Sequence, residues 1–129
     1  RKSGDLARRA AVWWSRAANL EDVRSRVKLA DHFYLGEGLP RDPVAAAAQY
    51  HRSIGQRSTT SAFNLALMYM RGLGVARDLH WATHMLRVSE YYGRQDGFPE
   101  VWLPIAMARA LLSCLWLLQS MERWNWASF

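Results

Sequence analysis

The residues that could carry chemistry are few, and their spacing builds no recognisable catalytic or metal site. His80 and His84 stand four residues apart, so both imidazoles would lie on one helix face and could approach a metal ion. The residue after His80 is Trp81, however, where the zinc-hydrolase motif has glutamate. We therefore interpret the two histidines as a surface pair and expect neither a metal nor a cofactor.

Nucleophilic and phosphate-binding patterns are also missing from the sequence. Cys114 lies in a strongly apolar segment, where we expect a buried structural thiol, and a single cysteine excludes an internal disulfide. Neither His32 nor His51 belongs to a spaced Ser/His/Asp pattern. The Gly72-x-Gly74 pair lacks the preceding strand and third glycine of a dinucleotide-binding loop. The sequence therefore predicts a protein that is not an enzyme.

The composition indicates a packed chain with a solvated basic surface. Half of the 129 residues are hydrophobic and 22% are charged, which fits one globular domain or part of one. The net charge of +6 could suit nucleic acid or anionic lipid. The basic residues are scattered among acidic ones, so no nucleic-acid partner is expected. The chain begins with Arg1 and carries no signal peptide, so we expect a fragment of a longer protein.

An internal repeat organises the chain. When the sequence is shifted by 36 residues, a helical run, a glycine turn and the start of a second helical run fall on their own counterparts. The first unit contributes Leu29, Ala30, Phe33, Gly36, Gly38, Asp42 and Ala46, and the second contributes Leu65, Ala66, Tyr69, Gly72, Gly74, Val75, Asp78 and Ala82.

Each repeated residue type has a physical role in a pair of antiparallel helices. Gly72 follows the first helix, where a left-handed residue is commonly needed, and the second glycine keeps the turn tight. Asp78 and Asp42 are candidate N-caps, and Pro43 suits the first helical position because its missing amide donor is not needed there. Ala82 has a small side chain that lets the two helices approach closely.

These patterns predict an all-α superhelix of stacked helix pairs, closed by a C-terminal helix. The stretch before the first full unit has an apolar stripe like that of a second helix. Polar connectors are expected at 19–24, 55–60 and 93–97, and regularly spaced aromatic residues such as Trp13 and Trp81 are expected in the core. The predicted organisation is a repeat domain over 5–96, with a partial repeat 5–19 and full repeats 25–55 and 61–93, followed by an apolar helix and membrane-proximal tail over 97–129.

The C-terminal segment is much more apolar than the repeats. From Val101 to Leu118 only Pro104 and Arg109 interrupt 18 residues, which is close to the minimum for a membrane span. Because an arginine at the centre of a bilayer is costly, we favour a capping or interface helix. Its tryptophans suit a membrane-surface belt or a patch that meets a partner, and the partner-binding candidates are Trp102, Trp116, Trp124 and Trp126.

The repeated pattern resembles the Sel1-like repeat family, which is related to the tetratricopeptide repeats. That family carries a Leu-Gly pair, an aromatic residue, a Gly-x-Gly-Val turn, an aspartate and an alanine in this order. Both units here have alanine, Ala30 and Ala66, where the family usually has glycine. The resemblance covers residues 5–93.

The order of features is also similar to the C-terminal repeats of the Sel1L/Hrd3 adaptor family of endoplasmic-reticulum-associated degradation. The similar segments are Phe63–Leu65, Gly72–Val75, Asp78–His80 and Val101–Pro104. This resemblance implies an adaptor at the luminal face of the endoplasmic reticulum membrane. Its partners would be a membrane-embedded ubiquitin ligase and associated degradation factors, and its tail would contact the membrane surface.

Two other functions are compatible with the same repeats. One is a generic Sel1-like scaffold in a bacterial or cytosolic signalling complex. The other is a basic, aromatic module that binds a membrane surface through charge and would lose that binding in salt. A signal peptide and a C-terminal span in the full-length protein would separate the luminal adaptor from the scaffold.

Overall fold

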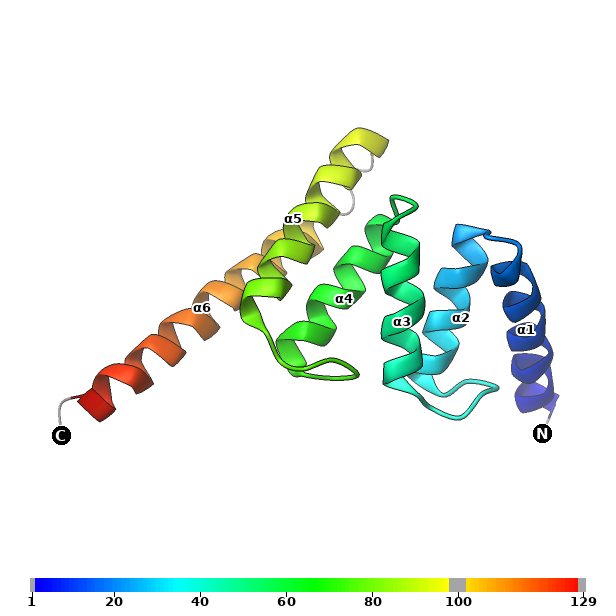
Figure 1. Cartoon of the computed structure of the whole chain (residues 1–129), viewed down its shortest axis with the longest axis horizontal. Coiled ribbons are helices and arrows are strands. Elements are labelled where there is room, and N and C mark those ends of the chain that lie inside the picture. The colour runs from blue at the N-terminus through cyan, green and yellow to red at the C-terminus, as the bar shows by residue number, and fades with distance from the viewer. Residues whose placement is uncertain (1, 98–101, 128–129) are drawn as a thin grey trace.

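The computed structural model describes residues 2–97 and 102–127 of the chain, with side chains given for 2–97 and 103–123. The described residues form six α-helices joined by short turns, and consecutive helices pack side by side in an array (Figure 1). This architecture confirms the all-α superhelix predicted from the sequence. The helices are α1 (Lys2–Asn19), α2 (Val23–Leu35), α3 (Pro43–Ile54), α4 (Thr59–Arg71), α5 (Leu79–Asp96) and α6 (Trp102–Ala127).

The two glycine turns repeat hydrogen bond for hydrogen bond at the 36-residue offset. Gly36 ends α2 and Gly72 ends α4 in the left-handed conformation, with φ of +74° and +68°. That conformation costs glycine little because it has no Cβ. The backbone amide of the aspartate six residues after each of these glycines then closes the turn. Asp42 donates to the Phe33 carbonyl at 2.9 Å, and Asp78 donates to the Tyr69 carbonyl at 3.0 Å.

Side-chain caps start four of the helices. The Asp42 carboxylate accepts from the Ala45 amide at 3.0 Å, and Asp78 accepts from the amides of His80 and Trp81. The caps of α2 and α4 are Asp22 and Ser58. These two escaped the sequence interpretation, although each has the residue type of an N-cap just before an apolar run.

Asp22 forms the tightest of these caps. Its carboxylate accepts from both the hydroxyl and the amide of Ser25, which is a buried residue at the first turn of α2. These hydrogen bonds hold the pKa of Asp22 below its ordinary value, because they favour the ionised form.

The second glycine of each turn touches the helix of the preceding unit. A Cβ on Gly74 would lie 2.3 Å from the Pro43 carbonyl oxygen at the start of α3. A Cβ on Gly38 would lie 2.4 Å from the Ala7 carbonyl oxygen in α1. Ala7 and Pro43 are themselves 36 residues apart, so the first glycine turn packs on α1 in the same way as the second glycine turn packs on α3. The second glycine therefore allows close packing between units as well as a tight turn.

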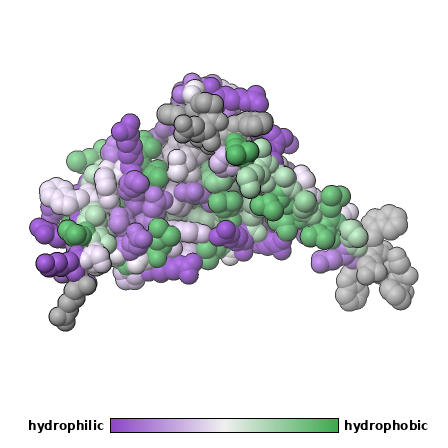
Figure 2. Space-filling view, turned by 180° about the vertical axis from the view of Figure 1, so that it is seen from behind, coloured by the Kyte–Doolittle hydropathy of each residue, from purple (hydrophilic) through white to green (hydrophobic). Residues whose placement is uncertain are grey.

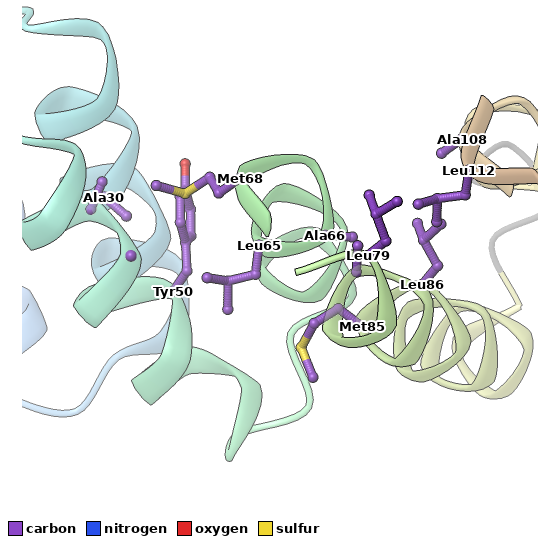
Figure 3. Close-up of a cluster of buried hydrophobic side chains, with 13 residues drawn as sticks. Ala30, Tyr50, Leu65, Ala66, Met68, Leu79, Met85, Leu86, Ala108 and Leu112 are labelled. Atoms are coloured by element: carbon purple, nitrogen blue, oxygen red, sulfur yellow. The ribbon is translucent and has the colours of Figure 1, made fainter. Parts of the chain in front are cut away.

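The core follows the same period. Pairs of residues 36 apart are buried together, and the alanines among them bring helices close while Leu65 fills the space between α3 and α4. Figure 3 shows this core running from Ala30 across α3, α4 and α5 to Leu112 on α6. The matched buried pairs are Ala11 and Ala47, Ser25 and Ser61, Leu29 and Leu65, Ala30 and Ala66, Ala46 and Ala82, Tyr50 and Leu86, and Ser53 and Ser89.

Two expectations about helix ends and faces are wrong. The connector expected at 93–97 is helical through Asp96, and Gly97 is the left-handed cap. Gly93 is buried inside α5, where a Cβ would meet the Thr59 side chain at 3.6 Å, so it marks a close approach of helices and not a turn. On α1 the apolar stripe was expected over Ala10, Trp13, Trp14, Ala17 and Ala18. Ala18 is buried as expected, but Trp13 is exposed and the buried Ala11 lies outside the stripe.

Two aromatic residues expected in the core face solvent instead. Trp13 is 67% exposed and Trp81 is 48% exposed. Trp13 lies on the exposed side of α1, whose main packing partner among the described helices is α2. Helical spacing alone did not distinguish an aromatic face that is buried from one that is left open.

Candidate partner-binding surfaces

The last helix is attached to the repeats through one narrow face. Ile105, Ala108 and Leu112 recur at helical spacing and are each 3% exposed, and Leu115 packs beside them. These residues lie against α5 and the edge of α4. The helix then continues beyond the array as a projecting arm (Figure 1).

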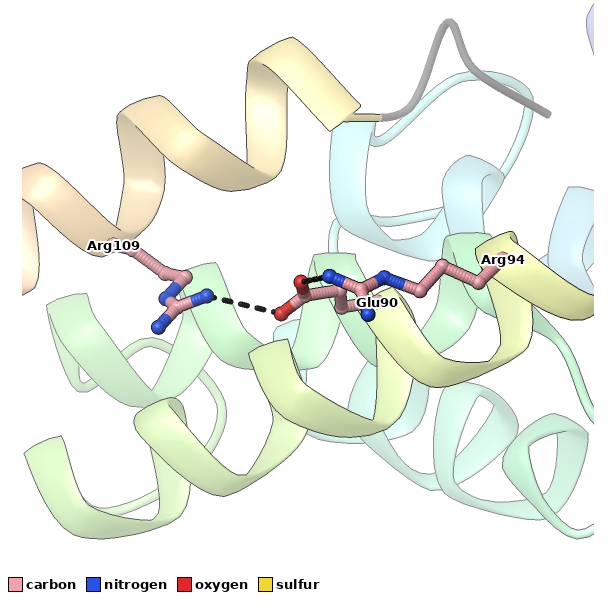
Figure 4. Close-up of polar contacts among 3 residues, drawn as sticks. All are labelled: Glu90, Arg94 and Arg109. Carbon is pink, nitrogen blue, oxygen red and sulfur yellow. Dashed lines mark hydrogen bonds and ion pairs between the residues drawn. The ribbon is translucent and has the colours of Figure 1, made fainter.

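A charged bridge reinforces this attachment. Glu90 on α5 accepts from Arg109 on α6 at 3.0 Å and from Arg94, one turn along α5, at 2.7 Å (Figure 4). The Glu90 side chain is mostly buried, so it holds Arg109 at the α5–α6 junction. The arginine that interrupts the apolar segment therefore has a partner within the protein.

The rest of α6 presents an exposed apolar surface, which we call the α6 outer face. Figure 2 shows apolar side chains running along the arm. Among the described helices, α6 alone is long and apolar enough to cross a membrane, over Leu103–Arg123, with 17% of that stretch buried. Contiguous exposed apolar surface of this kind marks an interaction site. The α6 outer face consists of Leu103, Met107, Leu111, Leu117, Leu118 and Met121.

Of the four candidate tryptophans, the structure describes the side chain of Trp116. It is 42% exposed and lines a cavity of about 390 Å³ between α6 and the start of α5. The cavity is also lined by Arg77, His80 and Arg123, so it combines one aromatic ring with three basic side chains. The side chains of Trp102, Trp124 and Trp126 lie outside the described residues.

A second surface is a row of aromatic rings across α3, α4 and α5. The Tyr69 and Trp81 rings stack with centroids 6.3 Å apart, and His84 meets the edge of Trp81 at 5.4 Å. The Tyr69 hydroxyl lies 3.2 Å from Nε2 of His51. Desolvation beside this row lowers the pKa of His51, although its side chain keeps contact with solvent. Tyr69 and Trp81 were expected in the core from their spacing, whereas Trp81 is exposed and Tyr69 is only partly buried.

The structure gives the chemically capable residues no catalytic arrangement within the described part of the chain. His80 and His84 are both exposed on α5, and no group of three His, Cys, Asp or Glu side chains that could hold a metal ion occurs among the described residues. Cys114 is exposed, so the buried thiol expected from sequence is wrong. It lies on the side of α6 turned away from Ala108 and Leu112, where no other helix packs.

The α6 outer face was missed as a set of partner-binding residues. The sequence singled out the tryptophans because aromatic residues concentrate at interfaces. The leucines and methionines around them carried the same signal in their density over residues 103–121. Only the packing of α5 against one side of α6 reveals which of them stay accessible.

Comparison with known proteins relates most of the chain to Sel1-like repeat proteins. It is 32% identical over 124 residues to "Protein sel-1 homolog 2" from Homo sapiens, covering 91% of this chain and 17% of that protein. It is 32% identical over 108 residues to the "ERAD-associated E3 ubiquitin-protein ligase component HRD3A" of Arabidopsis thaliana, covering 83% of this chain and 14% of that protein. The chain thus spans less than a fifth of the relatives it matches. No protein-family model matches it.

Solved structures agree on the architecture. A Sel1 repeat protein from Oxalobacter formigenes superposes with a TM-score of 0.64 at 20% identity, covering 67% of this chain and 36% of that one. The protective antigen c5321 of uropathogenic Escherichia coli, which displays an SLR fold, gives 0.64 at 25% identity, covering 72% of this chain and 22% of that one. At these identities the likeness concerns the helical repeat itself.

Proposed function

Because this chain is a Sel1-like repeat protein, we propose that it belongs to an adaptor that links misfolded substrates to a membrane-embedded ubiquitin ligase in endoplasmic-reticulum-associated degradation. A stack of helix pairs offers an extended surface to other proteins and needs no catalytic centre for that role. The adaptor would act without a cofactor, at the luminal face of the membrane.

One observation carries the proposal. The relatives named as components of this ligase system, HRD3A and HRD3B of Arabidopsis thaliana, are 32% and 35% identical to this chain over the aligned residues. The placement of α6 supports it, since an exposed apolar helix directly after the repeats suits a partner that lies in a membrane. The bacterial structures support the repeat fold alone, so a scaffold in a bacterial or cytosolic signalling complex is the weaker alternative.

Co-purification from membranes tests the proposal. The full-length protein, tagged and solubilised in mild detergent, should retain the membrane ubiquitin ligase. Substituting Leu111→Ser and Leu118→Ser on the α6 outer face should reduce the recovered ligase several-fold, because it removes apolar contact from the centre of that face. Leu6→Ser is the matched control, since Leu6 is exposed to a similar degree on α1, at the other end of the array from α6.

The localisation has its own readout. In sealed microsomes the repeat region should resist added protease until detergent is supplied. Absence of the ligase from the unmodified full-length protein under mild detergent would contradict the proposed function, and cleavage of the repeats in sealed microsomes would contradict the luminal placement.

A further inference from the structure

A buried tyrosine and a carboxylate meet at the junction of three helices. Tyr50 on α3 is 2% exposed, and its hydroxyl donates to Oδ1 of Asp31 on α2 at 2.5 Å. Both residues line a cavity of about 210 Å³ that opens between α2 and α4. The other lining residues are Tyr34, Leu35, Asn64 and Leu67.

The repeat itself provides a reference for this pair. In the second unit the positions equivalent to Asp31 and Tyr50, 36 residues on, are Leu67 and Leu86. Leu86 is fully buried in the core, so the fold is satisfied there by an apolar side chain. The carboxylate and the hydroxyl of the first unit are therefore additions that the repeat architecture does not require.

The Tyr50 hydroxyl holds the Asp31 carboxylate in place. Burial and the hydrogen bond to Asp31 raise the pKa of Tyr50 well above its ordinary value, so the hydroxyl stays protonated and serves as the donor. Asp31 forms no ion pair with any arginine or lysine among residues 2–97 and 103–123. Among the described residues Asp31 accepts a side-chain hydrogen bond from Tyr50 alone, and it lines the cavity, so its carboxylate can accept from a donor outside the chain.

The surroundings of this carboxylate suit a planar cation. Tyr34 supplies an aromatic ring, and Asn64 supplies a polar side-chain amide to the lining. A guanidinium offers five donors in a flat fork that pairs with a carboxylate and stacks on aromatic rings. Arg71 lies at the rim, where its Nη1 donates to the Tyr34 hydroxyl at 3.3 Å.

We propose that this cavity is a recognition pocket for an arginine side chain in an extended segment of a partner protein. The guanidinium pairs with Asp31 and lies beside Tyr34 and Asn64, while the Tyr50 hydroxyl holds the Asp31 carboxylate in place. The proposal rests on the repeats being a protein-binding scaffold, and it assigns them a preference for one side-chain chemistry.

Peptide titration of the full chain tests it. The probe is acetyl-Gly-Ala-Arg-Ala-Gly-amide, and its control is the same peptide with citrulline, which keeps the shape of arginine without its charge. The arginine peptide should shift the Asn64 side-chain amide signals in nuclear magnetic resonance, and citrulline should bind at least tenfold more weakly. Equal binding of the two peptides, or no binding of the arginine peptide at millimolar concentration, would overturn the proposal.

Variants of the pocket separate recognition from folding. Asp31→Asn should weaken the arginine peptide at least tenfold. Asp31→Leu combined with Tyr50→Phe, which removes both partners of the buried hydrogen bond, should abolish its binding while the melting temperature stays near that of the unmodified chain. Arg71→Gln should tighten binding about twofold or more, because a like charge at the rim is removed. Weaker binding by Arg71→Gln, or unchanged binding by Asp31→Asn, would contradict a cation pocket.

The outcome is distinguishable from that of the ligase experiment. Co-purification reports on the α6 outer face and the membrane partner, whereas the peptide reports on a pocket between α2 and α4. Ligase recovery with no peptide binding would reject the pocket alone, and peptide binding without ligase recovery would reject the ligase partner alone.

Discussion

Single glycines set the spacing between neighbouring units of the array. Gly74 adopts φ of +73° and leaves no room for a side chain against Pro43. Gly97 has a similar φ of +70° but faces open space. The two residues therefore separate the cost of a left-handed backbone from the cost of a steric clash.

Gly74→Ala should lower the free energy of unfolding by about 2–5 kcal/mol, since it adds overpacking to the left-handed penalty. Gly97→Ala should cost only about 1–2 kcal/mol, from the backbone penalty alone. Urea denaturation followed by circular dichroism measures both. Equal losses for the two variants would show that Gly74 does not seat the neighbouring helix.

The roles of some single residues could be predicted from residue type and position in the sequence. A glycine after an apolar run, and an aspartate before the next run, each have few physical uses, so Gly72 and Asp78 could be placed from sequence. The contact of Gly74 with Pro43 could not, because it joins residues 31 positions apart whose approach depends on how two units stack. The Asp31–Tyr50 pair escaped for the same reason.

At the scale of the element, α6 is the helix whose orientation matters most. Leu111 and Leu112 are neighbours in sequence, yet Leu112 is buried against α5 and Leu111 belongs to the α6 outer face. Leu112→Ala should destabilise the docking of α6 by about 2–4 kcal/mol, because it leaves a cavity at the junction. Leu111→Ala should change stability by less than about 0.5 kcal/mol.

Hydrogen exchange of the α6 amides measures this difference directly. Protection in α6 should fall in Leu112→Ala and hold in Leu111→Ala. Similar losses in both variants would mean that α6 is not attached through the face that includes Ala108. The sequence could not choose between these leucines, because apolar residues surround α6 on all sides and leave no amphipathic pattern to orient it.

At the scale of the molecule, the array is held together by contacts between neighbours. Among the described residues the main contacts join consecutive helices, and α6 also reaches past its neighbour to α4. A destabilising substitution at one end of the array should therefore lower the stability of the nearby helices and leave the distant helices unaffected.

Gly38→Ala tests this locality, because a Cβ at Gly38 would clash with the Ala7 carbonyl of α1. Hydrogen exchange should show that α1 loses protection while α4 and α5 keep theirs. A uniform loss across all helices would indicate one cooperative unit instead of a chain of neighbours.

The narrow attachment of α6 also has a mechanical consequence. From Ala108 to the end at Ala127 the helix extends 19 residues, or about 28 Å at 1.5 Å per residue. A tilt of about 10° at the Ala108–Leu112 anchor would then swing the far end by about 5 Å. The helix is a lever whose pivot is the α5 surface and the Glu90 bridge, so a small repacking of α5 is magnified into a large displacement of whatever grips the tip.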